Sequence, residues 1–180
     1  MIKTIIQTNE NPRRERPLNW FLWVISKLIF HPRTFYKELP KAGGTVGSLI
    51  FLFSCSLLFS IFKTFFVLEK KPLFFAIYLL NACSMPFVTA FLLYLVALVF
   101  SHNTFSYQIL FRVVAYANVT LLAAWIPGVS YVTGFWKFYL IGLGMVQVGH
   151  VTPLRAFWQL LTTALVLILL VRLSQLIMGG

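Results

Sequence analysis

The chain has 180 residues, of which 59% are hydrophobic and only 11% are charged. Soluble domains carry about 25% charged residues, so a water-exposed globular fold is excluded for a chain this apolar. The formal net charge of +11 comes without zinc-finger spacing or an RNA-binding aromatic motif, so a nucleic-acid partner is not expected.

The N-terminal part of the chain is basic. Eight of the fifteen Lys and Arg precede residue 42, namely Lys3, Arg13, Arg14, Arg16, Lys27, Arg33, Lys37 and Lys41. Residues 1–16 predict a mobile basic tail. Residues 17–44 predict two interfacial amphipathic helices, because the apolar stretch 17–30 is shorter than the roughly 20 residues that cross a bilayer. Pro32 suits the first turn of the second helix.

The interfacial helices carry aromatic and basic side chains suited to a membrane surface. Aromatic rings favour the headgroup region, and basic side chains are attracted to anionic lipid. We expect Phe35, Tyr36 and Leu39 to face the membrane. The residues predicted to contact lipid headgroups or the interface are Trp20, Trp23, Lys27, Arg33, Phe35 and Lys37.

Residues 45–180 predict an all-α membrane domain, a bundle of five transmembrane helices. The apolar runs lie at about 46–68, 73–100, 107–125, 131–148 and 154–177. Because the connections are short, consecutive spans should be antiparallel neighbours. No cleavable signal peptide is apparent in the first dozen residues.

The distribution of charge predicts the orientation. With the N-terminus inside, the arm, Arg112 and Arg155 place ten basic residues in the cytoplasm and leave five outside, namely Lys63, Lys70, Lys71, Lys137 and Arg172. The positive-inside rule therefore favours a cytoplasmic N-terminus and an outer C-terminus.

Three stretches resemble a known family. FHPRTFYKELPKAGG from Phe30, RVVAYANVTLLAAWIPGV from Arg112 and FYLIGLGMVQVGHVTPLRA from Phe138 are similar to motifs of bacterial Yip-one domain proteins. The resemblance implies a five-span bundle with a cytoplasmic N-terminus, located here in the bacterial inner membrane. Eukaryotic relatives bind small Ypt/Rab GTPases. We do not carry that partner over, because a short basic arm replaces their long N-terminal region.

Polar residues inside the apolar runs are candidate sites, since burying them in hydrocarbon is costly. Asn81 and Ser84 precede Pro86, and the three residues predict either a polar pocket at a kinked helix or an inter-helix hydrogen bond. Arg112 and Tyr116 share a helix face near Asn118. That group predicts either snorkelling and structural pairing or a headgroup or ligand site.

Three glycines in the fourth apolar run are candidates for helix packing. Gly134, Gly142 and Gly144 are expected to permit close helix packing.

The sequence offers few residues for catalysis or metal binding. All four acidic residues, Glu10, Glu15, Glu38 and Glu69, fall outside the apolar runs. No paired metal ligands, phosphate loop or serine elbow is present in the sequence, so no enzyme, metal or cofactor is expected.

Two functions therefore stay open. The first is a non-enzymatic protein that organises membrane or scaffolds a complex, with its basic arm on anionic lipid and with other membrane proteins or further copies of itself as partners. The alternative is a small transporter or lipid/ion conduit, with a site between spans two, three and four.

Overall fold

The computed structural model describes residues 17–39, 44–66, 72–101, 105–126 and 128–178, and the regular structure in these residues is helical. The predicted mobile tail at 1–16 lies outside the described residues. The elements are α1 (Pro17–Phe30), α2 (Pro32–Glu38), α3 (Thr45–Phe66), α4 (Pro72–Ser101), α5 (Tyr107–Ala117), η2 (Asn118–Thr120), α6 (Leu121–Ala124), α7 (Val129–Gly149) and α8 (Pro153–Met178).

Five stretches are long and apolar enough to cross a membrane, namely Thr45–Phe66, Leu73–Phe100, Tyr107–Ala124, Val129–Gly149 and Pro153–Leu170. The predicted all-α, five-span class is therefore confirmed. Local signals place the helix starts: Pro32 and Pro153 are first helical residues, where a missing N–H is harmless. Ser106 caps α5, its Oγ accepting a hydrogen bond from the Ile109 N–H at 3.4 Å.

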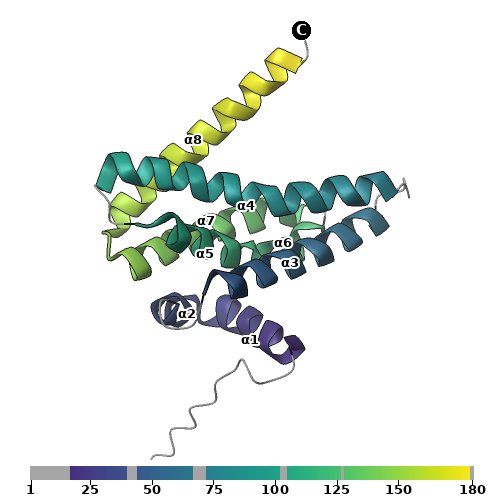
Figure 1. The fold of residues 1–180 in the computed structure, drawn as a ribbon, viewed down its shortest axis with the longest axis horizontal. Helices are drawn as coiled ribbons and strands as arrows, with labels where there is room; N and C mark the ends of the chain where they lie inside the picture. Colours follow the sequence, from purple (N-terminus) through teal and green to yellow (C-terminus); the bar gives the residue numbers. More distant parts are fainter. Residues whose placement is uncertain (1–16, 40–43, 67–71, 102–104, 127, 179–180) are drawn as a thin grey trace, which may run out of the picture.

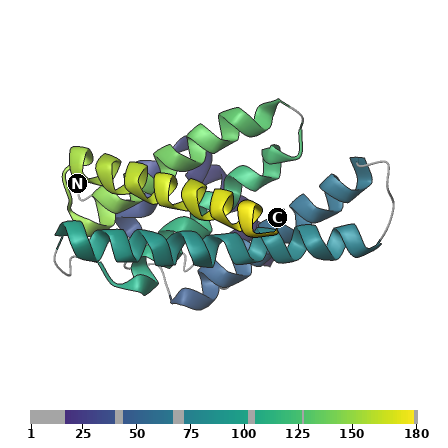
Figure 2. The same ribbon diagram turned by 90° about the horizontal axis from the view of Figure 1, so that it is seen from above.

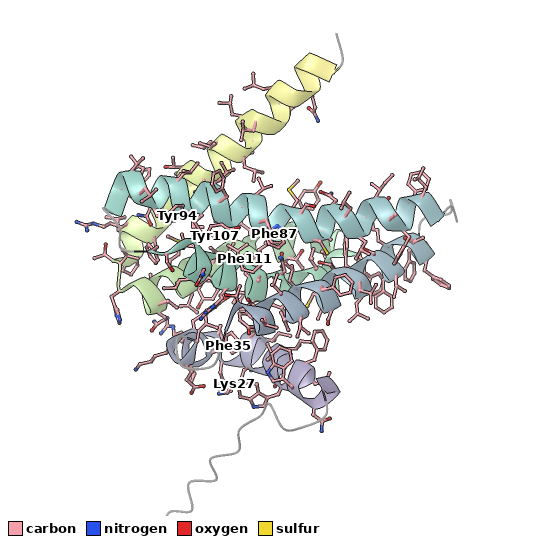
Figure 3. All side chains as sticks on the ribbon, in the orientation of Figure 1. Lys27, Phe35, Phe87, Tyr94, Tyr107 and Phe111 are labelled. Carbon is pink, nitrogen blue, oxygen red and sulfur yellow. The ribbon has the colours of Figure 1, made fainter. Side chains whose placement is uncertain are left out.

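Span three is the central helix of the bundle. Its α5 segment contacts α3, α4 and α7, and it is the most buried of the five spans. An aromatic ladder joins it to α4, where the rings of Phe87 and Phe111 stack at 4.7 Å and Tyr107 lies against both Phe111 and Tyr94 (Figure 3). A polar site built on span three is consequently shielded from lipid by its neighbours.

Span three is not one continuous α-helix. The 3-10 turn η2 at Asn118–Thr120 separates α5 from α6. Inside this turn the Thr120 hydroxyl donates to the Ala117 carbonyl at 3.1 Å, a local bond that competes with the regular helical pattern. Short 3-10 segments within helices often mark hinges or functional positions. The break places Asn118 in the middle of the bundle.

Two parts of the chain stand apart from the central helices. Figure 1 shows α1 and α2 on the flank of the bundle beside the first part of α3. It also shows the C-terminal half of α8 running away from the other helices, and Figure 2 shows α8 passing over the bundle between α4 and α7. Consistent with this arrangement, Leu165, Ile168 and Leu169 of α8 are exposed.

Candidate functional site

The inner face of α2 is built into the protein core. Tyr36 is fully buried, and its hydroxyl donates to the carbonyl of Val113 on α5 at 3.4 Å. Phe35 is only 6% exposed and meets the Tyr116 ring edge-on at 5.0 Å. Burial, with a smaller contribution from Tyr116, raises the pKa of Tyr36 well above its usual range.

This packing corrects one expectation about α2. We expected Phe35, Tyr36 and Leu39 to face the membrane, but all three are buried in the hydrophobic core. The reason is that neighbouring spans offer a packing surface for them. Gly144 of α7 presents no side chain toward the Tyr36 ring, and the Tyr116 ring of α5 packs against Phe35. Figure 3 shows Phe35 between α2 and the bundle.

The opposite side of α1 and α2 presents aromatic and basic groups. Trp23 and Phe30 are exposed, as are Arg33 and Lys37. Lys27 lies 4.5 Å from the centre of the Trp23 ring and forms an ion pair of 2.8 Å with Glu38, which links α1 to α2. Trp20, by contrast, turns inward and meets Phe51 of α3 edge-on at 6.5 Å. Of the six predicted headgroup residues, Trp23, Arg33 and Lys37 are exposed and Lys27 is half-buried, and Arg33 also lines a cavity formed with α7 and α8.

A polar pair lies inside the membrane domain. The Nζ of Lys137 on α7 donates to the Oδ1 of Asn118 in η2 at 2.6 Å. Asn118 is 1% exposed, and its Nδ2 has no hydrogen-bond partner among the described residues. Asn118 was a predicted site residue, whereas Lys137 was expected among the outer charges. The sequence did contain a signal for this position of Lys137: a single Lys within an apolar run usually faces the interior of a helix bundle.

The two predicted polar groups do not form one site. Asn81 and Ser84 are exposed on the surface of α4, while Pro86 is buried in the same helix. Tyr116 is enclosed by the rings of Phe35 and Phe51. The structure therefore joins Tyr116 to the packing of α2 and joins Asn118 to Lys137.

Arg112 lies in the middle of α5, six residues before Asn118. It is half-buried, and it lines a cavity of about 280 Å³ together with Leu39 and Gln108. Its Nε is buried and has no hydrogen-bond partner among the described residues. Arg112 is consequently close to the end of α2, not to the Asn118–Lys137 pair.

The three predicted packing glycines have different surroundings. A Cβ on Gly144 would lie 2.5 Å from Val113 Cγ1, so this site is close-packed. One on Gly142 would lie 3.1 Å from Leu160 Cδ1, the tip of a flexible side chain, so a small movement of that side chain would admit it. A Cβ on Gly134 would meet nothing within 4 Å. Gly149 was not predicted as a packing glycine, yet the Phe105 ring occupies the space where its side chain would lie.

Comparisons with known proteins identify one relationship. A family model described as the Yip1 domain matches residues 26–173. No curated protein and no solved structure matches the chain. Within the described residues, no group of three or more His, Cys, Asp or Glu is arranged to hold a metal ion.

Proposed function

The chain belongs to the Yip1 domain family, and from that premise we propose that it is a non-enzymatic multi-pass protein that organises membrane or scaffolds a membrane complex. Its α1–α2 unit binds anionic lipid at the cytoplasmic face. Other membrane proteins or further copies of the chain are the partners. The membrane is the bacterial cytoplasmic membrane, with the N-terminus inside and the C-terminus outside, as the excess of basic residues in the arm favours.

The observation that carries this proposal is the two-sided character of the α1–α2 unit. One side is fixed to the bundle through Phe35 and Tyr36, while Trp23, Arg33 and Lys37 are exposed on the other. A unit fixed in this way transmits a lipid contact directly to the spans. Each Lys or Arg near an anionic surface contributes on the order of 1 kcal/mol of attraction.

The test measures which lipid surrounds Trp23 in proteoliposomes. In a variant whose other tryptophans are replaced by Phe, brominated phosphatidylglycerol should quench Trp23 more than brominated phosphatidylcholine does. Adding Arg33→Gln and Lys37→Gln should remove this preference, because the attracting charges are gone.

A matched control uses Trp136 as the only tryptophan. Trp136 is 39% exposed on α7, in the half of that span farther from α2. Its quenching should not distinguish the two lipids, with or without the charge substitutions. Equal quenching of Trp23 by both lipids in the unsubstituted chain would refute the lipid-binding role.

The Lys137–Asn118 pair favours a second candidate function, a small transporter or conduit. No Asp or Glu falls in any of the five spans, so proton or cation coupling through an intramembrane carboxylate is not supported. A half-buried ammonium beside a broken helix suits a polar or anionic solute.

Flux into proteoliposomes distinguishes the two functions. Under the transport hypothesis, Asn118→Ala and Lys137→Met should slow uptake of a polar or anionic solute, while Asn81→Ala on the exposed surface of α4 should leave it unchanged. Flux that is absent, or equally insensitive to all three substitutions, argues for the first function alone.

A further inference from the structure

A long groove lies between α7 and α8. Its volume is about 1070 Å³, at the upper end of the roughly 300–1,000 Å³ of ligand sites. Aromatic and aliphatic side chains line it, among them Phe138, Leu143 and Leu160. Gly134 and Gly142 hollow the α7 wall because neither adds a side chain.

One end of the groove is polar and basic. Arg33 of α2 lines it together with Gln147, near the end of α7, and Pro153, at the start of α8. Arg33 is exposed, and we take it to mark this end of the groove because it shares the lining with residues at the end of α7 and the start of α8. An anionic group placed there would meet a guanidinium, which binds phosphate well through its planar array of donors.

The length of the groove matches a lipid chain. From Gln147 to Gly142 is about 7.5 Å along α7, and from Gln147 to Gly134 is about 20 Å, at 1.5 Å per residue. One leaflet of hydrocarbon is about 15 Å deep, half of the bilayer core. An acyl chain whose headgroup lies at Arg33 therefore runs past Gly142 and ends before Gly134.

We propose that this groove binds one anionic phospholipid, with its phosphate at Arg33 and an acyl chain along the α7 wall at Gly142. This site deepens the proposed function and rests on it, because Arg33 belongs both to the exposed basic groups of the α1–α2 unit and to the end of the groove, whereas the acyl chain lies between two spans. It predicts a retained lipid that resists exchange with the surrounding bilayer.

A transmembrane helix from a second copy is the competing occupant. A helix about 10 Å wide filling the same length takes on the order of 2,000 Å³, about twice the volume of the groove. An apolar helix also supplies no anion for Arg33. Volume and charge complementarity both favour a lipid.

The first test counts phospholipid retained by the purified full chain, using native mass spectrometry after incubation with equimolar phosphatidylglycerol and phosphatidylcholine. Arg33→Gln should lower the retained ratio of the anionic to the zwitterionic lipid about tenfold, the loss expected for a charge-assisted contact. Arg155→Gln is the matched control, since Arg155 is also exposed near the start of α8 but does not line the groove. Equal ratios in the two variants would overturn the proposal.

The second test fills the groove without touching Arg33, so its result is independent of lipid binding on the outer side of α1 and α2. Gly142→Leu should abolish retention of phosphatidylglycerol, and Gly134→Leu, beyond the end of the acyl chain, should preserve it. The atom that a Gly142 side chain would meet is the flexible tip of Leu160, so we expect this variant to fold. Thermal unfolding checks that it does.

Each further outcome of these experiments is decisive. If Gly142→Leu retains the lipid, the groove is not its site. If Gly142→Leu instead changes the mass of the assembly in multi-angle light scattering and leaves lipid retention unaltered, the groove holds a second copy. Should Gly142→Leu fail to fold, Lys37→Gln is compared with Arg33→Gln, because Lys37 is exposed on α2 but does not line the groove. An equal loss in these two variants would place the lipid on the outer side of α1 and α2 and overturn the proposal.

Discussion

The ammonium of Lys137 lies 2.6 Å from the side-chain oxygen of Asn118, across the contact between α7 and the 3-10 turn of span three. No carboxylate is available in any span to neutralise it. A Lys at the centre of a bilayer costs roughly 2.5–3.5 kcal/mol on insertion scales. The amide oxygen offsets part of this cost and gives the broken helix a fixed partner on α7.

Removing the amide acceptor should destabilise the bundle. We expect Asn118→Ala to lower the free energy of unfolding by about 2 kcal/mol, because it leaves the Lys137 ammonium without its hydrogen bond. Adding Lys137→Met removes the charge and should recover most of that loss. Unfolding in detergent of the wild type, both single variants and the double variant measures the coupling energy. Additive effects of the two substitutions would show that the pair contributes nothing to stability.

The close approach of α7 to α5 and α2 should be sensitive to a single methyl group. Gly144→Ala places a Cβ 2.5 Å from Val113 and 3.1 Å from the Tyr36 ring, so we expect it to cost about 1–3 kcal/mol. Gly134→Ala adds the same methyl to open space and should be neutral or stabilise α7 by up to about 1 kcal/mol. Thermal unfolding of the two variants compares them. Similar midpoints would mean that α7 is not tightly packed against α5 and α2 at this position.

The spans and their limits could be predicted from local signals alone. Apolar runs set their extent, and Pro32 and Pro153 mark helix starts whatever the rest of the chain does. The direction of Phe35 could not be predicted, because a short apolar helix can face lipid or protein equally well. The pairing of Asn118 with Lys137 depends on two spans meeting at one depth, information that hydropathy does not contain. The bacterial origin, the orientation and the lipid contacts stay predictions.

Ionisation of Tyr36 should make the fold sensitive to alkali. Its pKa is raised in the folded chain, so the neutral form is the one that folding favours. This contribution is complete below the unfolded pKa of about 10 and is lost as the pH rises above it. We expect the midpoint temperature of unfolding to decrease as the pH is raised from about 10 to about 11. In Tyr36→Phe that fall should be smaller, although this variant loses about 1 kcal/mol at neutral pH with its hydrogen bond to Val113. If the midpoint temperatures of the unsubstituted chain and of Tyr36→Phe decrease in parallel with rising pH, the alkali sensitivity does not come from Tyr36.

The end of the bundle away from α2 should depend on Trp125. Its ring stacks on Phe66 at 4.8 Å and on Phe62 at 5.3 Å, and its Nε1 donates to the Leu122 carbonyl at 2.8 Å. These contacts join the last turns of α3 to α6. Trp125→Ala removes both stacks and the hydrogen bond, so we expect a loss of about 3 kcal/mol. Trp125→Phe keeps an aromatic ring and should lose about 1 kcal/mol.

Trp158 on α8 is the matched control for this experiment, since it is 53% exposed. Replacing it by Ala removes the same indole from a mostly lipid-facing position, where bilayer hydrocarbon takes the place of the lost contacts. Its unfolding midpoint should therefore stay close to that of the unsubstituted chain. If Trp158→Ala is as damaging as Trp125→Ala, burial of indole surface in general, and not the stack on Phe62 and Phe66, accounts for the stability at this end.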